Sequence, residues 1–270
     1  MSIRQYRPRR INRHGATRNQ NFLLALLAIT TIACEISYPL THGGALTNLT
    51  IVTVYCAAAA MLLHSYLAFG KKFAVLFASI TLIYSFGIEV LGVKSGWPFG
   101  TYHYDSSLGV AIAGVPLLVP FAWVMMTYPT LIAARKVAHG WVFLYGGLGL
   151  MAWDIFLDPQ MVAAGRWHWK LVGPRSPFAS AIPLSNTAGW LFAGMGIIAI
   201  LNFALPKERR KAGASSTLPD LFLAWTLFAG VVSNLFFFHR PGLALFGGFL
   251  DAAILAPYLF VLRFGRPDFE

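Results

Sequence analysis

The stretch WDIFLDPQMVAAGRWHWKLVGPRSPFASAIPLSNTAGW, residues 153–190, decides how this chain folds. It begins inside an apolar run, yet it carries two carboxylates, Asp154 and Asp158. It breaks at Pro159 and passes through a Trp-His-Trp triplet at 167–169 before it re-enters an apolar run. A polar and aromatic interval between two apolar runs is typical of a loop between membrane helices, so the sequence predicts such a loop here.

The remainder of the chain is mostly lipid-soluble. It has 270 residues, of which 57% are hydrophobic and 11% are charged, and its mean hydropathy is +0.63. A soluble domain is on average about 25% charged. Several apolar runs approach the roughly 20 residues that a helix needs to cross a bilayer. The composition therefore predicts an all-α, polytopic integral membrane helix bundle.

Polar or Gly/Pro-rich connections divide the chain into about eight apolar segments. The predicted transmembrane helices cover residues 22–41, 47–69, 73–93, 110–133, 139–158, 187–205, 219–238 and 243–263. Positive residues concentrate in cytoplasmic segments, which gives a test of this number. If the N-terminus is cytoplasmic, most of the 21 Lys and Arg residues fall on inner segments. We therefore expect eight spans with both termini cytoplasmic.

The expected domain organisation is simple. A basic cytoplasmic tail, 1–20, precedes a single transmembrane bundle domain, 21–264, and a short cytoplasmic tail, 265–270. The tail shows no small-residue cleavage site after a short apolar core, so we expect no removed signal peptide. A net charge of +11 suits nucleic acid in a soluble protein. Here the positive residues sit at membrane-loop positions, so we expect the lipid bilayer, and no nucleic acid, as their partner.

Two predicted outer loops are much longer than the other connections. They cover 94–109 and 159–186, and both are rich in Gly, Pro and aromatic residues. The first contains KSGWPFGTYHYD, residues 94–105. Trp and Tyr at membrane interfaces are often only belt residues, so each aromatic has this alternative role. The inner 207–217 loop is basic, small and polar, which predicts a solvated linker.

Seven acidic residues lie within or beside the predicted spans. An ionised side chain at mid-bilayer costs about 3 kcal/mol, so such residues face the bundle interior. A rise of about 1.5 Å per residue places five of them in the outer half of the hydrocarbon layer. These five are Glu35, Glu89, Asp154, Asp158 and Asp251. Asp105 is expected just above them, whereas Asp220 is expected to be a helix-start residue beside the positive dipole end.

Asp154 and Asp158 are four residues apart and therefore share one helical face. Two carboxylates held close do not both ionise easily, and a carboxyl kept protonated can act as a general acid. The alternative is an aspartate bonded to a backbone amide or paired with an arginine such as Arg166. His103 and His168, in the outer loops, are weaker candidates for moving protons. The absence of HExxH, GxSxG, P-loop and GxGxxG motifs argues against zinc proteolysis, serine hydrolysis and nucleotide chemistry.

Several motifs in this region occur in a fixed order. They are Gly96-Trp97-Pro98-Phe99-Gly100-Thr-Tyr102-His-Tyr104, Leu108-Gly109, Gly114-Val-Pro116 running into Trp123, Leu157-Asp158-Pro159, Gly165-x-Trp167-x-Trp169 and Pro183-x-x-Asn186-x-x-Gly189-Trp190. Together they resemble the carotenoid biosynthesis membrane proteins of the CruF type. One departure is 173–181, where Pro174, Arg175 and Phe178 replace an expected Gly-Tyr-x-Gly-like turn.

The resemblance implies a carotenoid 1,2-hydratase, which adds water across the terminal double bond of an acyclic end group. It implies neither a redox cofactor nor a metal. The implied partners are a long apolar polyene, water and other enzymes of the carotenoid pathway.

The residues themselves fit this reaction. Protonation of a trisubstituted alkene gives a tertiary cation, which water captures and aromatic faces stabilise by about 1–2 kcal/mol each when desolvated. The expected catalytic residues are Asp154, Asp158, Glu89 and Asp105. The expected substrate-binding residues are Trp97, Tyr102, Tyr104, Trp167, Trp169, Asn186 and Trp190. Asp154 or Asp158 is the expected acid, and Asp105, Glu89 or Asn186 is expected to position the water.

Two other functions stay open at this point. The D-x-x-x-D spacing at 154–158 suggests a membrane prenyltransferase, although such enzymes need two Asp-rich motifs that hold a diphosphate through Mg²⁺. Intramembrane acids also occur in proton-coupled transporters, and a scaffold for pigment enzymes is a related alternative. The sequence shows no inverted repeat of the transporter kind.

Overall fold

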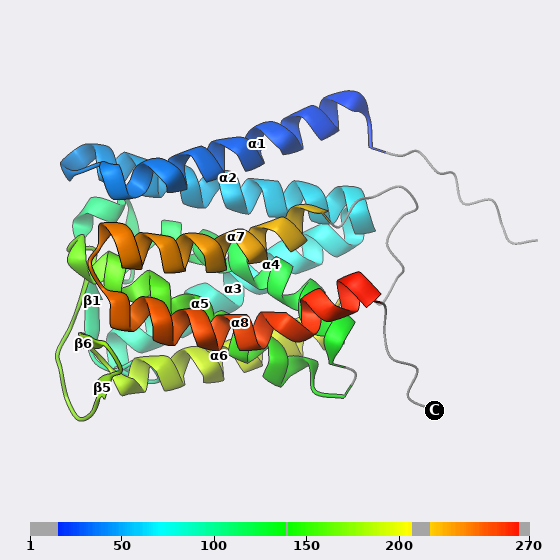
Figure 1. Ribbon diagram of the computed structural model, residues 1–270. Coiled ribbons are helices and arrows are strands. Elements are labelled where there is room, and N and C mark those ends of the chain that lie inside the picture. The colour runs from blue at the N-terminus through cyan, green and yellow to red at the C-terminus, as the bar shows by residue number, and fades with distance from the viewer. Residues whose placement is uncertain (1–15, 139, 207–216, 265–270) are drawn as a thin grey trace, which may run out of the picture.

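The computed structural model describes residues 16–138, 140–206 and 217–264 (Figure 1). Most of the predicted basic tail, the 207–216 part of the linker and the tail 265–270 lie outside the described residues. The described helices are α1 (Arg18–Ser37), α2 (Gly43–Phe69), α3 (Lys71–Ser95), α4 (Leu118–Val137), α5 (Val142–Ala163), α6 (Leu184–Ala204), α7 (Thr217–Val232) and α8 (Pro241–Phe264).

The prediction of an all-α, polytopic membrane protein is confirmed. Six helices are long and apolar enough to cross a membrane, and they are α1, α2, α3, α6, α7 and α8 with their short helical extensions. The remaining two, α4 and α5, lie among the others (Figure 1). Most side chains of α4 are buried, because α2, α3, α5, α6, α7 and α8 all pack around it. A helix enclosed in this way does not need a lipid-facing surface, which explains its lower hydropathy.

Successive helices run in opposite directions. The start of α1 and the end of α8 lie at one end of the bundle, and β1, β5 and β6 lie at the other (Figure 1). Lys71 and Lys72 begin α3, and Arg135 and Lys136 end α4, so both basic pairs lie at the end away from the strands. The two long loops therefore meet at one end of the bundle, which we call the loop end.

Helices α5 and α6 pack backbone against backbone. A Cβ atom added to Gly147 would lie 2.5 Å from Cγ and 2.9 Å from the backbone nitrogen of Met195. A Cβ on Gly194 would lie 3.1 Å from Cα of Gly147. Small residues allow this close approach in membrane helices. The contact holds the acidic face of α5 beside the start of α6.

Short strands order the loop end. Strand β1 (Tyr102–Tyr104) pairs antiparallel with β4 (Trp167–Trp169). The two other ribbons are β2 (Ala111–Ile112) with β3 (Val115–Pro116), and β5 (Arg175–Ser176) with β6 (Ala179–Pro183). The β1–β4 pair joins the two predicted outer loops side by side.

Three predicted helix boundaries differ from the structure. The expected break at Pro159 was wrong, because α5 continues through the proline to Ala163. Packing by neighbouring helices compensates for the hydrogen bond that a proline removes within a membrane bundle. The span predicted from residue 110 begins at Leu118, since Gly114 takes a φ of +85° in a turn between β2 and β3. The last predicted turns of α7 form a π-helix, η3 (Ser233–Phe237).

Candidate active site

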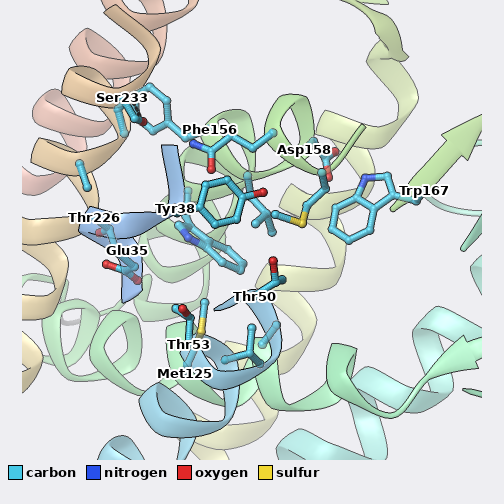
Figure 2. Close-up of a pocket in the computed structure, with 18 of the residues that line it drawn as sticks. Glu35, Tyr38, Thr50, Thr53, Met125, Phe156, Asp158, Trp167, Thr226 and Ser233 are labelled. Atoms are coloured by element: carbon cyan, nitrogen blue, oxygen red, sulfur yellow. Dashed lines mark hydrogen bonds between the residues drawn. The ribbon is translucent and has the colours of Figure 1, made fainter. Parts of the chain in front are cut away.

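A cavity of about 460 Å³ lies within the bundle (Figure 2). Its walls come from helices α1 to α7, and β1 and β4 contribute at the loop end. Most of its lining is apolar or aromatic, with a few polar side chains. This combination is typical of a site for an apolar small molecule that needs a few oriented polar groups.

Glu89 of α3 is the most fully hydrogen-bonded acid of the cavity. Its side chain is buried, and Oε2 accepts from the hydroxyls of Tyr102 at 2.6 Å and Tyr104 at 2.7 Å. Oε1 accepts from the indole nitrogen of Trp123 at 3.0 Å. The two tyrosines reach one carboxylate because alternate residues of a strand point to the same face.

The two hydroxyls act as permanent donors to Glu89. Burial, followed by the charge of the nearby Glu89 carboxylate, raises the pKa of Tyr102 and of Tyr104, so both phenols stay protonated. All three partners of Glu89 thus donate to it, an arrangement that suits an ionised carboxylate.

Asp154 and Asp158 share one partner, Asn186 at the start of α6. Its Nδ2 donates to Oδ2 of Asp154 at 3.1 Å and to Oδ2 of Asp158. All three side chains are buried, and the two carboxyl groups lie close enough to interact directly. The expected common face of Asp154 and Asp158 is confirmed by this shared contact. Two buried carboxyls in such proximity titrate as a pair and readily hold one proton between them.

No described basic side chain neutralises the three acids of the cavity. Within the part of the chain that the structure describes, Glu89, Asp154 and Asp158 form no ion pair with Lys, Arg or His. The suggested partner Arg166 is buried and instead donates to the Ser107 hydroxyl at 2.7 Å. The alternative in which Arg166 neutralises Asp154 or Asp158 is therefore wrong.

Aromatic side chains form one side of the cavity. Trp123 and Trp190 stack with centroids 4.6 Å apart and an interplanar angle of 11°, and Trp153 meets Trp190 edge-on. Trp167 and Trp169, from β4, pack against Tyr104 and Tyr102 of β1. The cavity therefore offers π-faces close to its carboxyl groups, a setting that stabilises a positive charge.

The structure brings most of the predicted site residues to this cavity. Those that line it are Glu89, Asp158, Tyr102, Tyr104, Trp167, Trp169, Asn186 and Trp190. Asp154 is buried behind this surface, one helical turn from Asp158, and its Oδ1 has no hydrogen-bond partner among the described residues.

Two predicted site residues lie elsewhere. Trp97 is 57% exposed and does not contribute to the cavity wall. Asp105 caps the short helix η2 (Ser106–Leu108), where its Oδ1 accepts from the Ser107 backbone at 2.8 Å. Hydrogen bonds from the Ser107 side chain and backbone lower the pKa of Asp105. This placement supports a structural role for Asp105, and its catalytic role stays a prediction.

The two loop histidines point away from the acids. His103 and His168 lie opposite each other in the β1–β4 ribbon, are exposed, and stack with centroids 5.2 Å apart. Because their neighbours in each strand face the cavity, the histidines occupy the outer face of the ribbon. The ribbon geometry thus separates them from the carboxyl groups.

Three contributors to the cavity were not among the predicted site residues. Glu35 of α1 lines it and accepts from the indole of Trp225 of α7. Tyr38 lines it from the short helix η1 (Tyr38–Leu40), directly after α1. Trp123 belonged to a sequence motif. Its hydrogen bond to Glu89 could not be predicted, because the residue lies within an apolar run. Asp251, expected at the same level as the other acids, lines a separate and much smaller cavity.

The cavity also reaches the lipid-facing surface. Ile36 of α1, Phe228 of α7 and Phe237 of η3 all line it, and they are 54%, 56% and 44% exposed. We call these three residues the apolar rim. An exposed apolar rim on a membrane helix faces hydrocarbon, so an apolar molecule can pass between bilayer and cavity without crossing water.

No three His, Cys, Asp or Glu side chains gather as a potential metal site within residues 16–138, 140–206 and 217–264. The chemistry of the described site is that of a carboxyl pair, a hydrogen-bonded carboxylate and aromatic faces.

The chain is similar to known proteins over the region that forms the cavity. The model of the carotenoid biosynthesis protein family matches residues 49–257, from α2 into α8. Bisanhydrobacterioruberin hydratase of Haloarcula japonica is 33% identical over 165 residues, which are 57% of this chain and 54% of that protein. The chain thus spans about half the length of this relative. No solved structure matches it. Since the family match covers most of the chain, including α2 to α7 around the cavity, the chain belongs to the carotenoid biosynthesis protein family.

Proposed function

We propose that this protein is a carotenoid hydratase that adds water across the terminal 1,2 double bond of an acyclic end group. The observation that carries the proposal is a carboxyl pair, held by Asn186, at the wall of an aromatic cavity without a basic partner among the described residues. The hydratase from Haloarcula japonica and the family match support the reaction class.

Asp158 is the proposed proton donor, because it is the member of the carboxyl pair that lines the cavity. Asp154 lies behind it and keeps one proton in the pair. Glu89, held by three donors, stays a carboxylate and stabilises the cation electrostatically. Trp167, beside Asp158 in Figure 2, and the other tryptophans present π-faces to the same charge.

The proton and electron pairs balance without another reactant. The π-electrons of the double bond take the proton from Asp158, which forms a C–H bond at C2 and a tertiary cation at C1. Water forms the C–O bond at C1 and loses a proton to the Asp158 carboxylate. The carboxyl pair therefore returns to its starting state, as general acid–base catalysis requires.

The proposed setting is the cell membrane. Residues 21–264 form the proposed transmembrane domain, the loop end faces outward, and both termini are cytoplasmic. The support for this orientation is the concentration of basic residues at the end of the bundle away from the strands. A polyene dissolved in the bilayer would enter past the apolar rim.

Expression in a bacterium that accumulates lycopene tests the proposal. Pigment extracted from cells with the wild-type protein should gain the mass of one water, or of two if both ends react. Cells with the empty vector supply the background. Unchanged pigment in cells whose membranes contain the folded protein would remove the proposed function. Proton-coupled transport by the same protein in proteoliposomes would then favour a transporter.

A further inference from the structure

Tyr38 presents an unused hydroxyl to the cavity. Its Oη is shielded from solvent and makes no hydrogen bond of normal geometry among the described residues; the Thr50 side chain lies near it, and the residue lines the cavity. A buried phenol ordinarily pairs its hydroxyl, so this group is available to a bound molecule. Figure 2 shows the hydroxyl directed across the cavity, toward the side that holds Asp158 and Trp167.

The polypeptide holds Tyr38 in this position from both sides. Tyr38 is the C-cap of α1, and its backbone N–H bonds to the carbonyl of Glu35. Pro39 is the second residue of η1, where the chain turns toward α2. The Tyr38 ring meets Phe238 edge-on, with centroids 6.4 Å apart. The hydroxyl is thus positioned by a rigid ring on a terminated helix.

Two further polar groups border the same part of the cavity. The indole nitrogen of Trp167 is buried, makes no hydrogen bond of normal geometry within the described ranges and lies near the Asp158 carboxyl group. The Thr50 hydroxyl donates to the Leu46 carbonyl at 2.8 Å, which leaves its oxygen able to accept. Tyr38, Thr50, Trp167 and Asp158 all line this one cavity, and Figure 2 labels them around its interior.

We propose that Tyr38 positions the water molecule that captures the cation, a role that rests on the proposed hydratase function. The attacking water needs one lone pair aimed at the cationic carbon and acceptors for its two protons. The Asp158 carboxylate, formed by protonation of the alkene, accepts the proton that leaves. The Tyr38 oxygen accepts the other O–H, which orients the water without taking its proton.

If Tyr38 positions the water, removing its hydroxyl should change how the cation divides between capture by water and loss of a proton. A cation that water does not capture loses a proton and returns to an alkene. In D₂O, the deuteron adds at C2, and an alkene that re-forms by loss of a protium, from C2 or from a methyl group on C1, carries deuterium. Removal of the Tyr38 hydroxyl should therefore slow hydration about ten- to thirtyfold, as expected for loss of one hydrogen bond in the capture step, and should leave proton exchange nearly unchanged.

The experiment uses full-length wild-type protein, Tyr38→Phe and Tyr55→Phe in proteoliposomes that contain lycopene, incubated in D₂O. Mass spectrometry measures hydrated pigment and deuterium in the recovered lycopene. Tyr38→Phe keeps the ring that packs on Phe238, and Tyr55 is a matched control because it is 40% exposed and does not line the cavity. Size-exclusion profiles in detergent verify that each variant is folded.

The expected result is a rise of at least about tenfold in the ratio of exchange to hydration for Tyr38→Phe, and no change for Tyr55→Phe. If the ratio of exchange to hydration in Tyr38→Phe equals that of the wild type, Tyr38 does not position the water. This holds whether the exchange and hydration rates both stay at the wild-type level or both fall together. If the wild-type protein neither hydrates lycopene nor introduces deuterium into it, the proposed hydratase function is excluded, and the role of Tyr38 is excluded with it. The two failures are distinguishable, because the first leaves hydration by the wild type intact.

Discussion

The indole nitrogen of Trp123 lies 3.0 Å from Oε1 of Glu89, and both side chains are buried between α3 and α4. The contact gives the carboxylate its third donor and places it beside the stacked Trp123–Trp190 pair. A buried carboxylate needs such donors, because no described basic side chain neutralises it. The bond therefore affects both the stability of the helix pair and the charge of the site.

Trp123→Phe should destabilise the protein, because it removes this donor and retains an aromatic ring. A hydrogen bond to a charged group contributes about 1.5–3 kcal/mol, and thermal unfolding in detergent measures the loss. Trp141→Phe is the matched control, since Trp141 is 56% exposed. Equal unfolding temperatures for the two variants would contradict the importance of the bond.

Glu89→Gln tests the charge itself. The amide keeps the shape of the side chain but removes the negative charge that is proposed to stabilise the cation, so hydration should fall at least about a hundredfold. Lycopene conversion by membranes with equal amounts of protein provides the measurement. Activity within a few fold of wild type would show that Glu89 serves packing alone.

The carboxyl pair is tested by replacing its members separately. Asp158→Asn should reduce hydration by about 10²–10⁴-fold, because it removes the proposed donor. Asp154→Asn should also reduce it, since the remaining carboxyl no longer shares a proton with a neighbour. Asp251→Asn controls for loss of a membrane acid, because Asp251 lines a separate cavity.

The pigment assay compares the three variants after their insertion has been verified. Full activity in Asp154→Asn would assign the proton to Asp158 alone. Full activity in Asp158→Asn would exclude the proposed donor.

Gly189 shows how closely α6 approaches the first loop. An added Cβ would lie 2.7 Å from the Pro98 carbonyl oxygen and 2.8 Å from a ring carbon of Phe99. Gly189→Ala should displace the loop, destabilise the protein by about 1–3 kcal/mol and reduce hydration. Gly87→Ala, on α3, meets no atom within 4 Å and should be neutral or slightly stabilising. A Gly189→Ala protein as stable as wild type would show that the loop is not held there.

Asp105, at the loop end, makes a contribution to the stability of the fold that depends on pH. Its pKa in the folded protein is lowered from the ordinary 3.8 by hydrogen bonds from Ser107. A lowered carboxyl pKa stabilises the fold above pH 3.8, and this contribution disappears as the pH falls through the folded value. The stability difference between wild type and Asp105→Ala should therefore shrink at acid pH.

Asp105→Asn is the control for that measurement, because asparagine caps a helix without titrating. Its stability difference from Asp105→Ala should not change with pH, and thermal unfolding across the acid range measures both. The same variant settles the catalytic prediction for Asp105: unchanged hydration by Asp105→Asn would remove this carboxylate from the reaction.

The membrane class and the acid cluster could be predicted because their signals are local. Apolar runs reveal helices, and the spacing of Asp154 and Asp158 places both on one face. The β1–β4 ribbon had no such signal, since each strand has three residues and its partner is far away in sequence. The apolar stretch around Gly114 was mistaken for helix, because its turn depends on two adjacent residues with positive φ, Ala113 and Gly114.

The positions of two aromatic residues at the candidate site could not be predicted from the sequence either. Trp123 and Tyr38 lie within or beside apolar runs, where an aromatic that donates to a carboxylate looks like any other buried or interfacial ring. Their roles depend on helix packing, which brings Trp123 to Glu89 and Tyr38 to the cavity that Asp158 lines. Sequence patterns on one helix contain no information about such partners.

The apolar rim of Ile36, Phe228 and Phe237 has a consequence for kinetics. A substrate that enters sideways is supplied from a two-dimensional solution, so its effective concentration is its mole fraction in the lipid. Adding empty vesicles that fuse with the membrane would lower the rate by surface dilution, although the total amount of pigment stays constant. Changing the aqueous volume would leave the rate unchanged.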